Sequence, residues 1–425
     1  MKHVQKITVA FVLAATLLVS AMLPSCAGGR DSVKVGAVYP LTGSLATAGE
    51  NARNGILFAV DIVNNEYDLD LPLAASKGIS SLGGAVLEVI FEDSRGSPDT
   101  GKSAARRLID EEEVVALIGC YQSAVTETVS RTTEEKGVPF ITATSTAPSL
   151  TRQGLEWFFR TTPDGEVFTR NFFQFLEDVR ELGGTVPERT GIVYEDSVWG
   201  TEVAEFAEQY AGAYGYQVIK KIPYSSDAAD VSGEVQRLKD ARVGLVLQAS
   251  YTADAILYME TYKEMDFSPV AILADDAGFA VPEFCSTLEE KSNYVFVRQA
   301  WSADLADVKP LVAEVTALYR QKYGTDMDDT CARIFTGMLV LADAIDRAGS
   351  TEPAAIREAL LATDIPGDKL ITPWDGVRFD PETHQNVLAK GVICQIIDRE
   401  YRTVWPWDLA AREIVWPMPA WNERE

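Results

Sequence analysis

Short β-branched segments alternate with amphipathic segments along most of this chain, and this alternation constrains the fold more than any other feature. VKVGAVYP (33–40) is typical of a strand, and residues 49–65 are typical of a helix with one apolar face. Further strands are expected at 87–93, 115–119 and 138–142, with helices between them. This strand–helix order predicts a mostly parallel sheet with helices on both faces.

The same alternation starts again after FFRTTPDG (158–165). Strands are expected at 190–196, 216–222, 243–250, 269–276 and 293–300, and helices at 166–179, 200–213, 232–240 and 252–265. Two long helices (307–323 and 330–348) and a β-rich piece containing GVRFD and GVICQIID follow. The sequence therefore predicts an α/β protein with two doubly wound parallel-sheet units.

The N-terminus is typical of an exported protein. Lys2 and Lys6 precede an uncharged segment, Ile7–Met22, which is short for a membrane span and suits a secretory signal. The segment ends in LPSC, which resembles a bacterial lipobox. We therefore expect residues 1–25 to be a lipoprotein signal peptide, Cys26 to be lipidated and residues 26–32 to form a tether, with plain secretion as the alternative. The protein would then be extracytoplasmic and membrane-anchored through Cys26.

Composition excludes several partners. The chain has 38 Lys and Arg against 63 Asp and Glu, a net charge of −25, and loss of residues 1–25 would remove two lysines and no acids. So acidic a chain has no electrostatic footprint for nucleic acid or anionic lipid. Four cysteines follow Cys26 without C-x-x-C spacing, so disulfides and buried free thiols both stay open: Cys120, Cys285, Cys331 and Cys394.

GSPDTGKS (96–103) matches the P-loop pattern of nucleotide hydrolases. A phosphate cradle needs consecutive backbone N–H donors, but Pro98 has none, and Asp99 would place a carboxylate in the cradle. Ser97 and Pro98 suit an N-cap and a first helical position, so the helix is expected to start before Gly101. A secreted P-loop-like hydrolase is therefore only a remote alternative.

Other catalytic patterns are absent from the sequence. Past the signal segment, His384 is the single histidine, in a polar segment, and no G-x-S-x-G elbow accompanies it. A multi-histidine metal site is impossible, and no G-x-G-x-x-G opens a helix after a strand. We expect no enzyme activity, no metal and no cofactor.

Polar and aromatic residues follow the expected strands at their carboxyl ends, where open α/β sheets bind ligands. Ser123 follows strand 115–119, and Thr144 and Thr146 follow strand 138–142, which suits a carboxylate. Trp199, Tyr251 and Asp276 follow strands of the second unit and suit an ammonium group with an attached side chain. Together the two groups predict an amino-acid clamp.

Several stretches carry a resemblance to a known family: VKVGAVYPLTGSLATAGENARNGILFAVDIVN, FEDSRGSPDTGKSAARRLIDEEEVVALIGC, VPFITATSTAPSLT, FFRTTPDG, and TGMLVLADAI followed by DGVRFD. With them the chain resembles the extracellular solute-binding proteins of branched-chain amino-acid ABC transporters, of the leucine/isoleucine/valine-binding type in the periplasmic-binding-protein-like I fold. The resemblance implies two lobes joined by three crossings, near residues 161–163, 297–300 and 394–398. Lobe I would hold residues 33–161 and 299–394, and lobe II residues 162–298 and 395–425 with the C-terminal tail.

The resemblance also implies roles for particular residues. Ser123, Thr144 and Thr146 would bind the α-carboxylate and Asp276 the α-ammonium group. The side-chain pocket would be lined by Tyr121, Trp199, Tyr251 and Phe335. Three departures leave the ligand open: Ala48 stands where the family often has an aromatic residue, Asp276 replaces a longer Glu, and a tethering disulfide lacks its first cysteine. Arg333 is expected at a solvated helix end, with a second ligand carboxylate as the alternative.

The implied function is capture of an amino acid, branched-chain or related, for ABC permease subunits, by a monomer that performs no chemistry. A ligand-sensing receptor domain for amino acids or small amides is the alternative, and the sequence does not separate the two. The Trp- and Pro-rich tail after Trp405 is expected to pack on the surface as a strap, with an interaction patch as the alternative.

Overall fold

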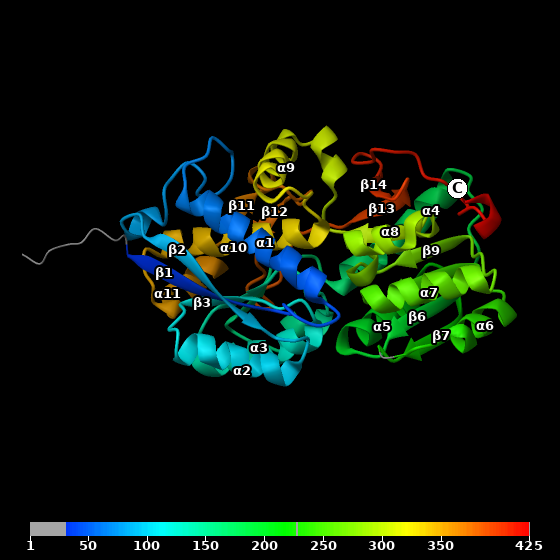
Figure 1. Cartoon of the computed structure of the whole chain (residues 1–425), viewed down its shortest axis with the longest axis horizontal. Coiled ribbons are helices and arrows are strands. Elements are labelled where there is room, and N and C mark those ends of the chain that lie inside the picture. The colour runs from blue at the N-terminus through cyan, green and yellow to red at the C-terminus, as the bar shows by residue number, and fades with distance from the viewer. Residues whose placement is uncertain (1–30, 227, 425) are drawn as a thin grey trace, which may run out of the picture. The chain divides into compact units, whose positions relative to one another are not determined.

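The computed structural model describes residues 31–226 and 228–424. The predicted signal peptide, Cys26 and most of the predicted tether lie outside the described residues. Within the described part, no helix combines the length and apolar character needed to cross a bilayer. Residues 31–424 are built mainly around two β-sheets (Figure 1).

The first sheet has five strands, all parallel, and comes mainly from the N-terminal third of the chain. In spatial order its strands are β2 (Val86–Asp93), β1 (Ser32–Tyr39), β3 (Ala116–Gly119), β4 (Phe140–Thr142) and β5 (Phe158–Arg160). The pair α1 (Ala46–Asn64) and α10 (Asp329–Ala348) packs over one face, and the pair α2 (Pro98–Asp110) and α3 (Ser123–Lys136) over the other. Helices α9 (Pro310–Tyr323) and α11 (Pro353–Leu361) extend the layer that contains α10 (Figure 1).

The second sheet has seven strands and is parallel except at one edge. In spatial order its strands are β14 (Glu400–Trp405), β13 (Val392–Ile397), β10 (Phe296–Gln299), β9 (Ala271–Ala274), β8 (Leu245–Ala249), β6 (Arg189–Glu195) and β7 (Gln217–Tyr224). β13 runs antiparallel to both β10 and β14. Its helices are α4 (Gly165–Glu181), α5 (Val198–Ala213), α6 (Ser232–Asp240), α7 (Thr252–Glu264) and α8 (Pro282–Leu288). Two mainly parallel sheets confirm the predicted fold class.

The GSPDTGKS segment forms an ordinary strand-to-helix turn. α2 begins at Pro98, and the Ser97 side chain accepts a hydrogen bond from the Thr100 N–H. The helix therefore starts before Gly101, as predicted. Gly101 lies against α3, and a Cβ there would come within 2.5 Å of the Val125 Cγ1 atom. The glycine serves helix packing here, so the P-loop spelling needs no phosphate to explain it.

The chain passes between the two sheets at three places. β5 of the first sheet ends at Arg160 and α4 begins at Gly165. The second passage follows β10, which ends at Gln299. The third lies before Val392, because β13 starts there and Val392–Gln395 pairs with β10. The third passage was predicted near residues 394–398, which was too late because those residues already belong to the second sheet.

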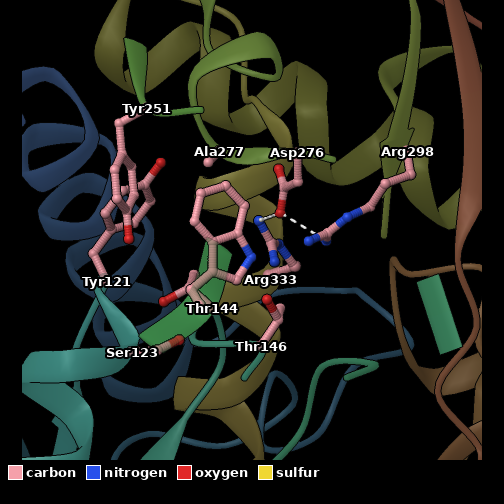
Figure 2. A pocket seen from close by; sticks show the side chains of 10 residues that line it. Tyr121, Ser123, Thr144, Thr146, Tyr251, Asp276, Ala277, Arg298 and Arg333 are labelled. Atoms are coloured by element: carbon pink, nitrogen blue, oxygen red, sulfur yellow. Dashed lines mark hydrogen bonds and ion pairs between the residues drawn. The ribbon is translucent and has the colours of Figure 1, made fainter. Parts of the chain in front are cut away.

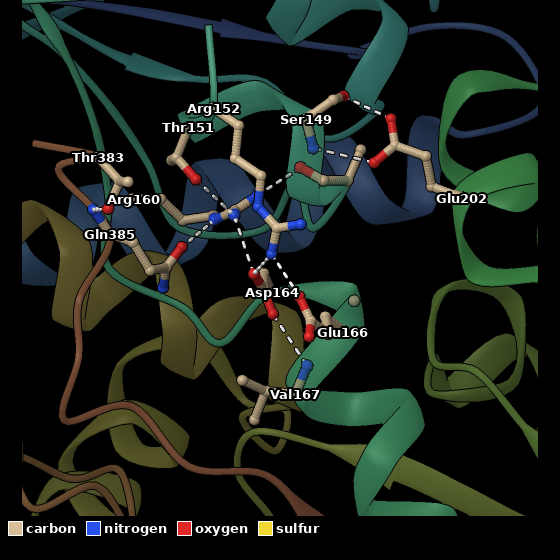
Figure 3. A network of polar contacts seen from close by, with 12 residues as sticks. Ser149, Thr151, Arg152, Arg160, Asp164, Glu166, Val167, Glu202, Thr383 and Gln385 are labelled. Atoms are coloured by element: carbon tan, nitrogen blue, oxygen red, sulfur yellow. Dashed lines mark hydrogen bonds and ion pairs between the residues drawn. The ribbon is translucent and has the colours of Figure 1, made fainter. Parts of the chain in front are cut away.

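Arg160 organises the first passage from a fully buried position (Figure 3). Its guanidinium donates to the Ala147 carbonyl at 2.7 Å and to Thr151 Oγ1 at 3.0 Å, and it lies 3.7 Å from the carboxylate of Asp164, the N-cap of α4. Burial lowers its pKa to about 10, which still leaves it charged at neutral pH. This buried charge ties the end of the first sheet to the start of α4.

The C-terminal tail packs on the second sheet as predicted. Trp416 and Trp421 join the apolar cluster of that sheet. The Trp421 indole donates to the Phe267 carbonyl at 2.8 Å, and the Met418 N–H donates to the Val270 carbonyl at 2.9 Å. The tail therefore acts as a strap. The four described cysteines are all buried and unpaired, which answers the question of disulfides that the sequence left open.

Candidate ligand-binding site

Loops at the carboxyl ends of strands from both sheets enclose one cavity (Figure 2). Its lining residues are Tyr121, Ser123, Thr144, Thr146, Trp199, Tyr251, Asp276, Ala277, Arg298 and Arg333. The cavity has about 280 Å³ of empty space, counting the part that opens to solvent. Ligand pockets combine aromatic walls with a few convergent polar groups, and this lining has both.

Three hydroxyl groups form the side of the cavity that follows β3 and β4; we call Ser123, Thr144 and Thr146 the hydroxyl wall. The Ser123 oxygen accepts from the Ala147 N–H at 3.3 Å, so its proton is free to donate. Thr144 donates to the Cys120 carbonyl at 2.9 Å and keeps only acceptor capacity. The Thr146 carbonyl accepts from the Gly165 N–H at 2.7 Å, but its hydroxyl makes no hydrogen bond to the part of the chain that the structure describes, although the residue is buried.

Backbone donors add to the hydroxyl wall. α3 begins at Ser123, and the side chain of its N-cap residue, Gln122, caps none of the first N–H groups. The first N–H groups of a helix have no partner within the helix, and they carry partial positive charge. These N–H groups, together with the hydroxyl donors of Ser123 and Thr146, suit a ligand carboxylate.

Asp276 lies at the opposite side, held in a conformation that few residues adopt. Its backbone has φ +52° and ψ −137°, and Ala277 also has a positive φ, of +44°. Such a conformation costs on the order of 1–3 kcal/mol and is found mostly where function requires it. The turn that follows β9 therefore places a carboxylate in the cavity at some expense of stability.

Two buried arginines bind the same oxygen of Asp276; we call Asp276, Arg298 and Arg333 the charged wall. Asp276 Oδ2 accepts from Arg298 Nη1 at 2.9 Å and from Arg333 Nη2 at 2.8 Å (Figure 2). Arg298 also donates from Nε to Asp275 at 2.8 Å, and Arg333 Nη2 lies 2.7 Å from Asp329. Three carboxyl groups and two guanidinium groups thus form one row.

The row crosses from one sheet to the other. Asp276 follows β9 and Arg298 lies in β10, and both strands belong to the seven-stranded sheet. Arg333 is on α10, which packs over the five-stranded sheet. Arg298 is further held by Phe168, with the guanidinium carbon 3.7 Å from the ring centroid. The Asp276–Arg333 pair therefore joins the two halves of the cavity.

Burial shifts several pKa values in and beside this row. Burial raises the pKa of Asp329 to about 7, against the opposing charge of Arg333. Burial also raises the pKa of Asp275, and that of Asp328 to about 6. Burial disfavours the charge of Arg333, but Asp276 and Asp329 outweigh this effect and the pKa of Arg333 is raised. Arg333 therefore stays charged, while Asp329 titrates close to neutral pH.

Several polar atoms around the cavity have no hydrogen-bond partner among the described residues. They are Asp276 Oδ1, the Tyr121 hydroxyl, and Arg333 Nε and Nη1. Buried polar groups are nearly always paired, so such orphan atoms mark the places where ligand or water atoms bind. Burial raises the pKa of Tyr121, so its hydroxyl stays neutral and can donate.

Aromatic rings close the rest of the cavity. Trp199 and Tyr251 have ring centroids 5.0 Å apart, and Tyr121 lies 6.0 Å from Tyr251. Seven of the eight ligand-binding residues proposed from the sequence therefore line this single cavity.

The eighth residue, Phe335, was predicted wrongly to line the cavity. It is fully buried in the apolar cluster under α1, stacked on Phe58 with centroids 5.2 Å apart. It sits two residues beyond Arg333 on α10, and two helical positions differ in direction by about 200°. Because Arg333 faces the cavity, Phe335 faces the core. Ala48 is also buried in that cluster and is not part of the lining.

Arg333 was expected at a solvated helix end, and this too was wrong. Its side chain is only 2% exposed. The first turn of α10 lies inside the molecule, with Asp328 capping it and Asp329 accepting from the Ala300 N–H at 2.8 Å. Arg298 was missed altogether. A single charged residue in the apolar stretch NYVFVRQA was the signal that could have revealed it.

His384 has a structural position. Its ring stacks on Phe159 with centroids 4.5 Å apart, and its Nδ1 lies 3.1 Å from the Phe158 carbonyl. It does not line the cavity. Among the described residues, no cluster of three or more His, Cys, Asp or Glu side chains could hold a metal ion.

Two doubly wound sheets with one polar cavity at their carboxyl ends define a protein that binds a small ligand. The chain belongs to the periplasmic binding protein family: residues 32–396 match the sequence model described as Periplasmic binding protein. The protein is accordingly a ligand binder and not an enzyme.

Individual relatives agree with this assignment. The chain is 27% identical over 414 residues to Leu/Ile/Val-binding protein homolog 7 of Brucella suis biovar 1 (strain 1330), covering 95% of this chain and 98% of the relative. Its fold is similar to that of the leucine-binding protein LivK of Thermotoga maritima MSB8, with TM-score 0.75, 22% identity, and 88% and 97% of the two chains covered. It is also similar to the solute-binding protein of an ABC transporter from Rhodopseudomonas palustris BisB5 in complex with 3,4-dihydroxy benzoic acid, with TM-score 0.73, 18% identity, and 88% and 96% covered.

Proposed function

We propose that this protein is an extracytoplasmic solute-binding lipoprotein that captures an amino acid, branched-chain or related, and delivers it to an ABC permease. The names of the Brucella suis and Thermotoga maritima relatives, Leu/Ile/Val-binding and leucine-binding, support the ligand class. The name of the Rhodopseudomonas palustris protein supports the link to an ABC transporter.

One observation carries the proposal: donors and an unpaired carboxylate oxygen lie on opposite walls of one cavity. Ser123 and Thr146 have hydroxyl protons free for an α-carboxylate. Asp276 Oδ1 is unpaired and can accept from an α-ammonium group, and Thr144 on the hydroxyl wall has acceptor capacity only. Charge-assisted hydrogen bonds contribute about 1.5–3 kcal/mol each, so a few of them with one buried side chain reach micromolar affinity, about −8 kcal/mol.

The proposal also covers the two lobes that would close on the ligand and the lipid that would anchor the protein to the membrane. The two lobes, residues 33–161 with 299–394 and residues 162–298 with 395–425, would close on the ligand, with the third boundary moved ahead of Val392 to keep β13 whole. Cys26 would carry the lipid. A Cys26→Ser variant expressed with its signal should then leave the detergent phase in phase partitioning, whereas the parent protein stays in it.

A thermal-shift screen followed by calorimetry tests the ligand class, because a ligand that binds only the folded state raises its melting temperature. The panel holds the L-amino acids, the corresponding amines and 2-hydroxy acids, and 3,4-dihydroxybenzoate. We expect stabilisation only by molecules that carry both an α-amine and a carboxylate. Equal binding of the 2-hydroxy acids would remove the ammonium contact from the proposal. Uptake of the labelled ligand by cells that lack the gene then tests transport.

A further inference from the structure

Arg333 has more donors than its protein partners use. Its Nη2 atom serves both Asp276 and Asp329, at 2.8 and 2.7 Å. Its Nε and Nη1 atoms are buried and have no acceptor among the residues that the structure describes. A guanidinium group carries five N–H donors, three of them on Nε and Nη1 together. These donors belong to a residue that lines the cavity.

The α-amino and α-carboxyl groups of a ligand do not account for these donors. The free hydroxyls of Ser123 and Thr146 provide for the carboxylate, and Asp276 Oδ1 provides for the ammonium group. Arg333 Nε and Nη1 and the Tyr121 hydroxyl then remain. They are left for the rest of the ligand, its side chain.

An aliphatic side chain cannot pair with these atoms. Closing a leucine or valine side chain against them would keep charged donors out of water with no acceptor, which is costly. Sites built to hydrogen-bond a polar group discriminate strongly against analogues that lack it. The cavity lining therefore favours a side chain that ends in an oxygen.

The charged groups beside Arg333 can also adjust to a ligand side chain that ends in a carboxylate. With all five groups ionised, the row of three carboxyl and two guanidinium groups has a net charge of −1, and protonation of Asp329 would bring it to zero. Asp275 and Asp329 pair with the same arginines but do not line the cavity. Burial raises the pKa of Asp329 to about 7, so this carboxyl can take up a proton when a negative group arrives.

We propose that Arg333 binds a side-chain oxygen of the ligand, and that the site takes amino acids whose side chain ends in a carboxylate or a carboxamide. The inference rests on the proposed capture of an amino acid and narrows it. It differs from the Leu/Ile/Val specificity in the name of the Brucella suis relative.

Calorimetry on the unmodified protein is the first test. L-Glutamate, L-aspartate, L-glutamine and L-asparagine are compared with L-leucine, L-isoleucine and L-valine. At least one oxygen-bearing ligand should bind about 10-fold or more tightly than every aliphatic one, since a hydrogen bond to a charged group is worth about a factor of 10 to 100. Titrations in two buffers of different ionisation enthalpy distinguish a carboxylate side chain from a carboxamide. A ligand with a side-chain carboxylate should bind with proton uptake by Asp329, and a ligand with a carboxamide should bind without it.

A pair of variants on α10 is the second test. Arg333→Lys keeps a positive charge for Asp276 and Asp329 but removes the Nη1 and Nε donors. Arg347→Lys is the matched control, because Arg347 is on the same helix, pairs with Asp343 four residues earlier as Arg333 pairs with Asp329, and does not line the cavity. Arg333→Lys should weaken the oxygen-bearing ligand about 10-fold more than leucine, and Arg347→Lys should change neither. Melting curves of both variants confirm that they fold.

The outcomes separate this inference from the proposed function. If leucine, isoleucine or valine binds most tightly, the site captures an amino acid but the role of Arg333 is wrong. Equal weakening of all ligands by Arg333→Lys would place Arg333 on the α-carboxylate and would also overturn the inference. If no amino acid binds at all, the proposed function itself fails.

Discussion

The hydroxyl wall and the charged wall hold their polar groups in different ways. Ser123 and Thr144 bond to backbone atoms near the ends of β3 and β4, within 25 residues along the chain. Asp276 is held by side chains 22 and 57 residues away, Arg298 and Arg333. The hydroxyl wall is therefore neutral and held by partners close in the sequence. The charged wall is held by ion pairs between distant elements, so loss of one member should disturb the others.

The largest effect is expected from breaking the charged wall at its centre. Asp276→Ala leaves Arg298 and Arg333 facing the cavity without their shared acceptor. Breaking a buried ion pair costs about 3–5 kcal/mol of stability, and we expect ligand affinity to fall about 100-fold or more because the ammonium contact is lost too. Calorimetry and denaturant unfolding measure the two losses.

Asp275→Ala is the control for this prediction. Asp275 also pairs with Arg298 and is buried, but it does not line the cavity. This variant should lose stability without a comparable loss of affinity. Similar affinity losses in both variants would mean that the row of charges, rather than the Asp276 oxygen, supports binding.

The charged wall should also make stability depend on pH, which the neutral wall cannot do. Burial raises the pKa of Asp329 to about 7 in the folded protein, from 3.8. The unfolded chain therefore releases this proton first as pH rises, so the contribution is fully present below about pH 4 and is lost as pH rises through 7. By the relation between pKa shifts and free energy, the loss is no more than about 4 kcal/mol.

Asp329→Asn removes this titration. Unfolding free energies of the variant, measured from pH 4 to pH 8, should decline less steeply than those of the parent protein. The difference between the two slopes is the measurement, because other carboxyl groups contribute to both curves alike. Parallel curves would show that Asp329 titrates normally in the folded state.

A smaller effect is expected from the hydroxyl wall. Thr146→Val keeps the shape and removes a hydroxyl that makes no bond to the described residues. Affinity should fall about 10-fold, the value of one hydrogen bond to a charged group, with little change in stability. Thr132→Val on α3 is the control, since its buried hydroxyl bonds the Thr128 carbonyl and lies outside the lining. Equal affinity of the Thr146 variant and the control would remove Thr146 from the carboxylate site.

The contrast between the walls also explains what could be predicted from the sequence. Ser123, Thr144 and Thr146 directly follow strands, so strand recognition and the rule that ligands bind at carboxyl ends were enough to find them. The same rule found Asp276. It could not find Arg298, which lies inside a strand, or show that Asp276 would share two arginines, because these pairings depend on how α10 and β10 meet in space.

The boundaries of strands and helices were also hard to predict where they depend on neighbours that are distant in the sequence. The parallel strands and their helices have strong periodic patterns and were found. The short β5 and α8 were missed, and β13 was cut at Cys394, although Val392–Gln395 pairs with β10 and the strand runs on to Ile397. Short segments have too few residues to show a period, so only their neighbours in the sheet define them.

The smallest effect on binding is expected at Phe335, where a resemblance and the structure disagree. Phe335→Leu should change affinity less than about 2-fold, because the ring stacks on Phe58 in the core and does not line the cavity. Stability should fall by about 1–2 kcal/mol from imperfect repacking. A large affinity loss at unchanged stability would return Phe335 to the ligand pocket. It would also mean that α10 turns about its axis when ligand binds, which would take Arg333 out of the cavity and break the Asp276–Arg333 pair that joins the two halves of the cavity.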